Sequence, residues 1–412
     1  MSDVPTFDLT LTSLAYGGDA IGRLPDGRAV FVPFALPGER VRVRLAEEKR
    51  GHARAELVEV LEPSPQRIAP LCIHFGVCGG CHYQHMPYEA QLAAKAGILR
   101  EQLERIGGLA GPPVQPGVPS PNPYYYRNHV EFHLTPQGRL GFYKARSSEV
   151  FAVQVCHLPE GMINTVWPQL EFEPVSELER IGLRLGAGDD IQLILESNDP
   201  LPPEFTDEDL PLSAVYLSPA GSLVLAGSEQ VTIEVWERPF RVSAGSFFQV
   251  NTPMAEAMVR HLLDNLTLDP GTTVLDVYCG VGLFSAFLAP RVGRVIGIES
   301  SHPAVEDFAF NLDEFDNVEI YEAAAEEVLP GFEAHPDVIV LDPPRTGVDR
   351  RVLDAILASK ASTLAYISCD PATLARDARR LATGGYRLEQ VTPFDLFPQT
   401  FHIESISFWK LK

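Results

Sequence analysis

The stretch TVLDVYCGVGLFS, residues 273–285, determines the fold of the C-terminal part of this 412-residue chain. Its first five residues suit a buried strand, glycines follow at positions 280 and 282, and a helix is expected after them. Glycines in such a turn let a ligand approach the backbone at the N-terminus of the following helix. Strand, glycine loop and helix in this order predict an open α/β sheet of the Rossmann type.

The next strand, expected at residues 294–299, ends in Glu299, whose carboxylate could accept hydrogen bonds from ribose hydroxyls. The third glycine of a dinucleotide fingerprint is absent, because Ser285 stands in its place. This substitution argues against NAD. Asp-x-x-x-Gly-x-Gly followed by such a glutamate is the usual arrangement for S-adenosylmethionine, so we expect that cofactor.

Two more predicted strands end in side chains that suit chemistry. A strand at 363–367 leads into Ser-Cys-Asp-Pro at 368–371, and a strand at 337–341 leads into Asp-Pro-Pro-Arg at 342–345. Open α/β sheets bind ligands at the carboxyl ends of their strands. Cys369 at such an edge is a candidate nucleophile, although free cysteines are more often buried for packing.

The N-terminal residues 1–62 predict a separate small β domain. Short alternating runs between 7 and 61 are interrupted by turn signals such as Gly17-Gly18 and Pro25-Asp26-Gly27. This pattern is typical of an OB-like barrel that binds oligonucleotides, and its order of strands and turns resembles a TRAM domain, a small RNA-binding barrel. The arginines at 40, 42 and 44 share one strand face, which is either an RNA contact or a solvated surface.

Residues 63–240 predict a central α/β domain that begins with a metal-binding pattern. Cys72, Cys78 and Cys81 have the spacing C-x5-C-x2-C, which suits a zinc ion or an iron–sulfur cluster. Either group needs a fourth ligand. The candidates are His74, His82, His85 and Cys156.

An amphipathic helix is expected at 87–107 and could pack on the last domain, residues 241–412. Between residues 170 and 238 the chain has 15 acidic and three basic residues, so this stretch carries −12 of the net charge of −22. We expect it to be a scaffold with a solvated face. No apolar run reaches the ~18 residues of a membrane helix, and residues 1–5 show no signal peptide. A cytoplasmic, monomeric protein with reduced cysteines is therefore expected.

Four motifs in the last 170 or so residues resemble, in type and order, those of the RNA 5-methyluridine methyltransferases (the RlmD/RumA and TrmA group). The motifs are D-x-Y-C-G-x-G at 276–282, D-P-P-R-x-G at 342–347, S-C-D-P-A-T-L-A-R-D at 368–377 and F-P-Q-T-x-H-I-E-S at 397–405. The barrel and the cysteine pattern also resemble the ribosomal-RNA branch of this family. The resemblance implies methylation of uridine C5 in RNA, with 23S rRNA as the expected substrate and tRNA as the second candidate.

The resemblance also implies roles for individual residues. Cys369 would be the nucleophile, Glu404 would accept the C5 proton, and Asp342 would contact the pyrimidine edge or orient the nucleophile. Because Cys369 precedes a helix N-terminus, we expect a lowered thiol pKa. The implied cofactor contacts are Gln249, Tyr278, Gly280, Gly282, Glu299 and Asp342. The implied ligands of a [4Fe–4S] cluster are Cys72, Cys78, Cys81 and Cys156.

Other functions fit parts of the sequence less well. A cytosine-C5 methyltransferase usually has proline directly before its catalytic cysteine, where this chain has Ser368. In amino-methylating enzymes an aromatic residue follows Asp-Pro-Pro, whereas Arg345 follows here. A non-catalytic RNA-binding or folding factor on a methyltransferase fold remains the alternative from a different class.

Overall fold

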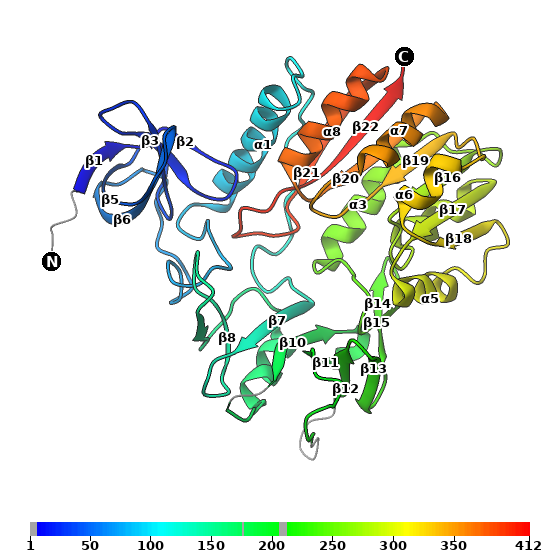
Figure 1. Cartoon of the computed structure of the whole chain (residues 1–412), viewed down its shortest axis with the longest axis horizontal. Helices are drawn as coiled ribbons and strands as arrows, with labels where there is room; N and C mark the ends of the chain where they lie inside the picture. The colour runs from blue at the N-terminus through cyan, green and yellow to red at the C-terminus, as the bar shows by residue number, and fades with distance from the viewer. Residues whose placement is uncertain (1–5, 175–176, 206–211) are drawn as a thin grey trace.

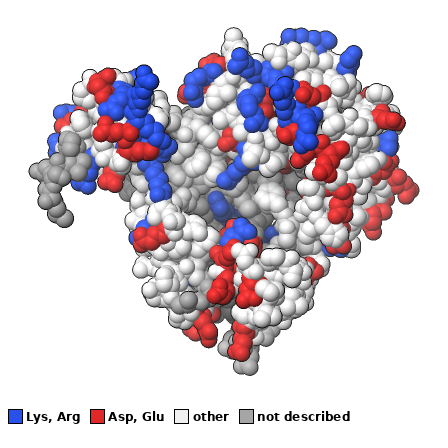
Figure 2. Space-filling model, in the orientation of Figure 1, with Lys and Arg blue, Asp and Glu red and all other residues white. Residues whose placement is uncertain are grey.

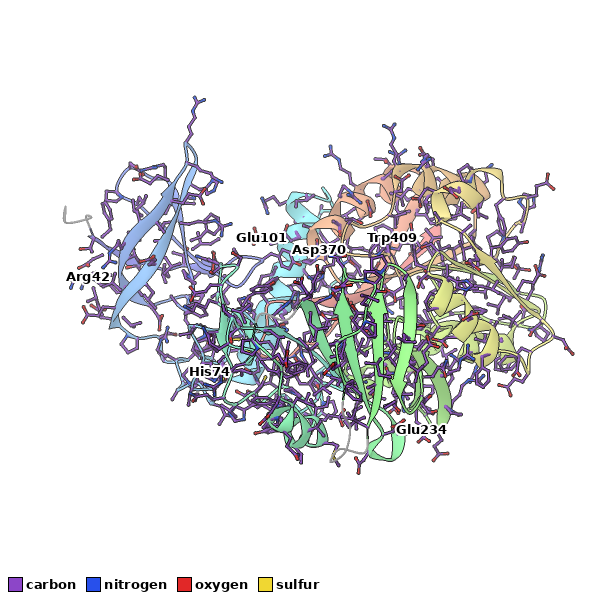
Figure 3. The ribbon with its side chains drawn as sticks, turned by 60° about the horizontal axis from the view of Figure 1, so that its bottom comes forward. Arg42, His74, Glu101, Glu234, Asp370 and Trp409 are labelled. Atoms are coloured by element: carbon purple, nitrogen blue, oxygen red, sulfur yellow. The ribbon has the colours of Figure 1, made fainter. Side chains whose placement is uncertain are left out.

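The computed structural model describes residues 6–174, 177–205 and 212–412. Residues 1–5, on which the signal-peptide expectation rests, lie outside this range. Three lobes are visible in Figure 1: a small β lobe at the N-terminus, a central lobe of strands, and a large α/β lobe at the C-terminus. Figure 3 places Arg42 in the first of these lobes, His74 beside the central one and Trp409 on the sheet of the third.

The N-terminal lobe is a six-stranded, strongly curved sheet with the order β1-β5-β6-β4-β3-β2. Its alternating sequence directs one set of side chains inward, and Val30, Val41 and Val43 are fully buried. The strands are β1 (Thr6–Thr10), β2 (Ser13–Leu14), β3 (Ala20–Arg23), β4 (Ala29–Val32), β5 (Arg40–Glu48) and β6 (His52–Glu62).

The central lobe is built on a seven-stranded sheet with the order β13-β12-β11-β10-β7-β8-β9. It includes most of the acidic stretch, and its buried face packs around Phe132, Ile181 and Leu183. A separate hairpin, β14–β15, leads into the last lobe. The elements are β7 (His129–Leu134), β8 (Leu140–Tyr143), β9 (Val150–Ala152), α2 (Gly161–Val166), β10 (Leu178–Leu185), β11 (Ile191–Ser197), β12 (Ser213–Ser218), β13 (Gly221–Ala226), β14 (Gln230–Val235) and β15 (Arg238–Ser243).

The C-terminal lobe contains the predicted open sheet, with the order β18-β17-β16-β19-β20-β22-β21. Its first five strands are parallel, and β22 runs antiparallel between β20 and β21. The strands are β16 (Thr273–Val277), β17 (Arg294–Glu299), β18 (Val318–Glu322), β19 (Val338–Leu341), β20 (Thr363–Ser368), β21 (Tyr386–Phe394) and β22 (Glu404–Leu411). The helices are α3 (Thr252–Asn265), α4 (Leu283–Leu288), α5 (His302–Asn311), α6 (Ala325–Val328), α7 (Arg350–Ser359) and α8 (Pro371–Thr383).

Helix α1 (Tyr88–Arg105) precedes the central sheet in the chain but lies against α8 of the C-terminal lobe. Leu99 and Leu103 belong to the same apolar cluster as Leu374 and Tyr366, so the helix shares the core of that lobe. The described helices include none that is long and apolar enough to cross a membrane.

Candidate active site

The predicted site residues meet at one edge of the C-terminal sheet. Tyr278, Glu299, Asp342 and Cys369 each lie at, or directly after, the carboxyl end of a parallel strand. Glu404 reaches the same edge from the opposite direction. It begins β22, whose next residue pairs with the last residue of β20.

A cavity of about 1380 Å³ opens at this edge. It is lined by seven of the predicted residues: Gln249, Tyr278, Gly280, Glu299, Asp342, Cys369 and Glu404. Gly282 is not in its wall. This glycine has φ +90°, and an added Cβ would lie 2.4 Å from Leu312, so its absent side chain allows α5 and its end to pack under the loop. Gly282 was expected to contact the cofactor. Its position instead gives it a role in shaping the glycine loop.

The cofactor end of the cavity is organised around the Glu299 carboxylate. It accepts hydrogen bonds from the backbone N–H groups of Gly280 (3.0 Å), Ser300 (2.7 Å) and Ser301 (2.8 Å). A side chain at Gly280 would meet nothing within 4 Å, so the loop leaves open space for a ligand beside this carboxylate. These features fit the ribose of S-adenosylmethionine.

Ser285, which replaces the third fingerprint glycine, has a structural role in this loop. Its hydroxyl donates a 2.6 Å hydrogen bond to the buried carboxyl of Asp276 at the start of the motif. Burial raises the pKa of Asp276 to about 6, and the hydrogen bond from Ser285 opposes that shift. The departure from the dinucleotide pattern thus stabilises the loop.

The catalytic end of the cavity holds two carboxyls with raised pKa values. Burial, together with the neighbouring Asp342, raises the pKa of Glu404 to about 8. Burial, with Asp276 and Glu299 nearby, raises the pKa of Asp342 to about 7. Both groups can therefore exchange protons near neutral pH, which suits general acid–base chemistry.

The expectation of a lowered pKa for Cys369 is wrong for the free protein. Burial, followed by the charges of Glu404 and Asp342, raises its pKa to about 12. The net shift is upward although Cys369 stands just before the N-terminus of α8, whose first N–H groups are already occupied. The Asp370 carboxylate accepts hydrogen bonds from the N–H groups of Ala372 (2.9 Å) and Thr373 (2.8 Å).

Several residues of the site were not predicted from the sequence. Arg345, Phe397 and His402 line the cavity, and the positive charge of Arg345 acts on both Cys369 and Glu404. All three stand inside quoted motifs, so the motifs themselves could have indicated them.

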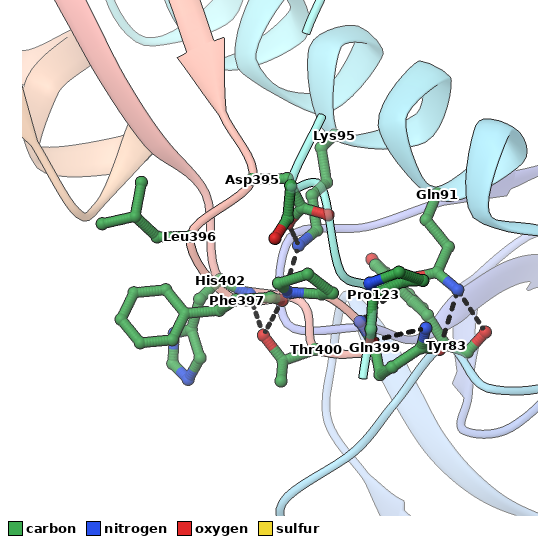
Figure 4. Close-up of polar contacts among 12 residues, drawn as sticks. Tyr83, Gln91, Lys95, Pro123, Asp395, Leu396, Phe397, Gln399, Thr400 and His402 are labelled. Atoms are coloured by element: carbon green, nitrogen blue, oxygen red, sulfur yellow. Dashed lines mark hydrogen bonds and ion pairs between the residues drawn. The ribbon is translucent and has the colours of Figure 1, made fainter. Parts of the chain in front are cut away.

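The loop between β21 and β22, which ends at Glu404, is held from α1 (Figure 4). Lys95 donates to Asp395 (2.6 Å) and to the carbonyl of Phe397 (3.0 Å). The Gln91 side-chain amide donates to Oε1 of Gln399 (2.9 Å) and accepts from the backbone N–H of Gln399 (3.0 Å). Half of the buried residues of α1 are polar (Gln91, Lys95 and Gln102), so the apolar pattern in the sequence did not indicate this contact.

The four predicted cluster cysteines line a second cavity of about 830 Å³, between the central sheet and the segment before α1. Their thiols are free, but no group of His, Cys, Asp or Glu within the described ranges has the geometry of a metal site. Of the three histidines considered as a fourth ligand, only His74 lines this cavity. Its Nε2 atom is already engaged, because it accepts a hydrogen bond from the N–H of Gln154 (3.1 Å).

In a comparison with known proteins, both ends of the chain match protein-family models. Residues 227–411 match the family tRNA (Uracil-5-)-methyltransferase, and residues 4–58 match the TRAM domain. Proteins described as uncharacterized RNA methyltransferases are similar over nearly their whole length. That of Thermosynechococcus vestitus is 36% identical, covering 98% of this chain and 97% of its own. That of Aquifex aeolicus is 35% identical over 100% of both chains.

Among solved structures, the fold resembles that of Pyrococcus abyssi tRNA (uracil-54, C5)-methyltransferase in complex with S-adenosyl-L-homocysteine. The TM-score is 0.74 at 24% identity, covering 98% of this chain and 100% of that chain. The methyltransferase fold and the N-terminal TRAM domain expected from the sequence are thus confirmed. The chain belongs to a family of RNA methyltransferases, and its C-terminal part matches the tRNA (Uracil-5-)-methyltransferase family.

Proposed function

We propose that the chain methylates uridine C5 through a covalent adduct between Cys369 and C6 of the base. The observation that carries this proposal is the meeting of Cys369, Glu404 and Asp342 in one cavity with the cofactor loop. Uracil C5 is a poor nucleophile by itself. Addition of the thiolate at C6 turns C5 into an enolate-like carbon, which can attack a methyl sulfonium. S-adenosylmethionine supplies that methyl group.

The residues of this chain then complete the reaction. Once C5 carries the new methyl group, the Glu404 carboxylate takes the C5 proton, and the Sγ–C6 bond breaks to release the thiolate of Cys369. Asp342 in its protonated form can donate a hydrogen bond to O4 of the base as negative charge develops there. Asp342 also lies beside the cofactor loop, which supports a contact to S-adenosylmethionine.

The high thiol pKa means that substrate binding has to assist formation of the thiolate. Arg345 is the cation whose charge already lowers the pKa of Cys369. The sulfonium charge of the bound cofactor would act in the same direction. The target base has to leave its stack to reach Cys369, which favours a uridine in a loop or a single-stranded segment.

We further propose that Cys72, Cys78, Cys81 and Cys156 hold a [4Fe–4S] cluster of structural importance. They share one cavity, and backbone N–H groups donate to the sulfurs of Cys72 and Cys78 (both 3.4 Å). Such hydrogen bonds are usual for metal-bound thiolates. Four thiolates would leave no open coordination position for catalysis.

Arg127, which lines the cysteine cavity, supports this proposal. Within the described part of the chain its guanidinium makes no ion pair, and it lies over the rings of Tyr126 and Phe397. Arg127 is half-buried, and its one side-chain hydrogen bond among the described residues is donated to the Tyr126 hydroxyl (3.4 Å), so an anionic group beside it would be favourable. A cluster ligated by four thiolates is anionic and would provide that partner.

We propose 23S rRNA as the substrate, acted on by a cytoplasmic monomer with domains at 1–62, 63–240 and 241–412. The TRAM domain and the four cysteines support this choice through their resemblance to the ribosomal-RNA branch. The Pyrococcus abyssi neighbour, which acts on uracil-54 of tRNA, makes tRNA the second candidate. Methyl transfer to defined rRNA and tRNA transcripts, compared at equal concentration, separates the two.

The mechanism is tested with the variant Glu404→Gln. We expect it to form a covalent RNA adduct, visible as a shifted band on a denaturing gel, because the C5 proton cannot leave. The matched control, C369A/E404Q, should form no adduct. Product released by E404Q at the wild-type rate, or full methylation by C369A, would contradict the assigned roles. A non-catalytic RNA-binding factor would methylate neither transcript.

A further inference from the structure

The catalytic cavity continues as a groove along the outside of the C-terminal lobe. Its wall includes Asp349, Arg350 and Leu353 at the start of α7. The opposite wall is α8, which contributes residues 376, 377, 379, 380 and 383. Four of these, at 376, 379, 380 and 383, have the i, i+3, i+4 and i+7 spacing of one helix face. The groove is therefore bounded by one continuous side of α8 that leads away from Cys369.

Positive charge on this groove is only partly neutralised. Arg376 is paired with Asp377, and Arg380 with Asp354. Arg379 is exposed, and its guanidinium makes no hydrogen bond or ion pair among the residues that the structure describes. Arg350 has a side chain that is 82% exposed and reaches a carboxylate only at 4.0 Å. Arg345, at the mouth of the cavity, also makes no ion pair in the described ranges.

The arginines at 40, 42 and 44 in the barrel, unlike Arg350 and Arg379, have carboxylate partners at close range. Their side chains project from β5 and are all paired with carboxylates of the neighbouring strands. The pairs are Arg40–Glu62 (3.0 Å), Arg40–Asp8 (3.8 Å), Arg42–Asp8 (2.9 Å), Arg42–Glu59 (3.3 Å) and Arg44–Glu56 (3.6 Å). These arginines would have to break existing pairs to bind phosphate, so this face offers little net attraction.

Figure 2 shows how charged side chains are distributed over one face of the molecule. Lys and Arg gather over the helices at the top of the C-terminal lobe and, mixed with Asp and Glu, on the N-terminal lobe. Asp and Glu prevail on the central lobe and at the edge near β18. In a chain with a net charge of −22, a polyanion is repelled from most of the surface. The arginines of the groove form a local exception that is continuous with the catalytic cavity.

We infer that this groove, through Arg350 and Arg379, binds phosphates of the RNA strand that flanks the target uridine. The inference rests on the proposed function, because it takes the base in the cavity to be the target. Guanidinium groups bind phosphate oxygens in bidentate fashion, and each contact displaces condensed counterions from the RNA. Successive turns of α8 can therefore follow a single strand as it leaves the site.

The test measures binding of a fluorescently labelled substrate RNA between 50 and 300 mM salt, without cofactor. The variant R350Q/R379Q should weaken binding at every sequence tested and lower the slope of log affinity against log salt by about 0.7 for each arginine. R379K keeps the charge and should retain most of the slope. R42Q, which removes a paired arginine of the barrel, should change the slope little.

An unchanged slope in R350Q/R379Q, with a reduced slope in R42Q, would overturn the inference and place the RNA on the barrel. Because both groove side chains are exposed, circular dichroism should confirm that the variants fold. Methylation at saturating RNA should stay near the wild-type rate in R350Q/R379Q, while KM for RNA rises. Failure of the proposed chemistry would appear in C369A and E404Q and would leave this binding result unaffected.

Discussion

Glu404 and Cys369 must both be ionised for their proposed roles as base and nucleophile. In the free protein, burial favours the neutral form of each side chain. A buried carboxyl with a pKa of about 8 is a stronger base than an exposed one once it is ionised, but at pH 7 it is mostly protonated. The same burial that keeps Cys369 protonated also removes water from the reacting bond. Proton transfer near Glu404 should therefore control the rate at neutral pH.

We expect kcat at saturating RNA and cofactor to rise from pH 6 to a maximum between about 7 and 8 and to fall at higher pH, because Glu404 must be ionised and Asp342 protonated. Below its pKa, Glu404 is protonated and cannot take the C5 proton, so each unit of acidification should cost about tenfold. The measurement is initial-rate methylation of one transcript between pH 6 and 9.5. A profile that is flat from 6 to 8 would show that a protonated Glu404 does not limit turnover.

At the scale of single elements, the loop between β21 and β22 depends on parts of the chain far away in sequence. Helix α1 holds residues 395–402 from one side through Lys95 and Gln91. The barrel touches the catalytic strand end from the other side. The Tyr16 hydroxyl donates a 2.8 Å hydrogen bond to Asp370, next to Cys369, and its ring packs edge-on against Phe401.

Lys95→Met should destabilise the protein strongly. Lys95 and Asp395 have side chains only 4% and 1% exposed, so loss of the lysine leaves a buried carboxylate without its partner. Breaking such a pair typically costs about 3–5 kcal/mol. Urea unfolding of K95M and of K95M/D395L measures the effect, and the double variant should recover much of the loss. Equal stabilities of K95M and wild type would show that the pair contributes nothing.

Tyr16→Phe should lower kcat with little change in KM for RNA. The variant keeps the ring contact to Phe401 but removes a hydrogen bond to a carboxylate, a loss of about 1.5–3 kcal/mol at a buried site and less at this partly exposed one. Alkylation of Cys369 as a function of pH provides a second readout of the strand end. Y143F, at an exposed tyrosine, is the matched control. A change in KM alone would assign Tyr16 to RNA binding.

At the scale of the whole molecule, the cysteine cavity connects the central sheet to the segment that leads into α1. Cys72, Cys78 and Cys81 come from that segment, and Cys156 follows β9 of the central sheet. A cluster ligated by all four would fix the two parts together. The position of α1, and with it the catalytic loop, would then depend on the cluster.

Anaerobic purification should give a brown protein with about four irons per chain. C156S should lose iron and unfold at lower temperature, because both parts of the fold lose their connection. C279S is the matched control, since Cys279 is buried in the glycine loop and packs against Gly297. Stoichiometric zinc without iron in the wild-type protein would contradict the proposed iron–sulfur cluster. The four cysteines would then form a zinc site instead.

The sequence by itself determined the glycine loop, the strand ends and the order of the domains. These features depend on short-range patterns: alternation in the barrel, apolar runs before Asp342 and Cys369, and glycines that permit positive φ. The resemblance of four motifs then indicated the chemistry. Even Gly282, which does not line the cavity, lies where local backbone conformation requires it.

Only the tertiary structure showed which charges, hydrogen bonds and ion pairs from distant segments meet at these residues. The pKa of Cys369 depends on the burial of its thiol and on the carboxyls of Glu404 and Asp342, which come from other parts of the sheet, and the first N–H groups of α8 are occupied by Asp370. The arginines of β5 look like an RNA surface in the sequence but are paired with Asp8 and with carboxylates of β6. Electrostatic energy depends on distance and burial in three dimensions, and neither quantity can be read from sequence spacing.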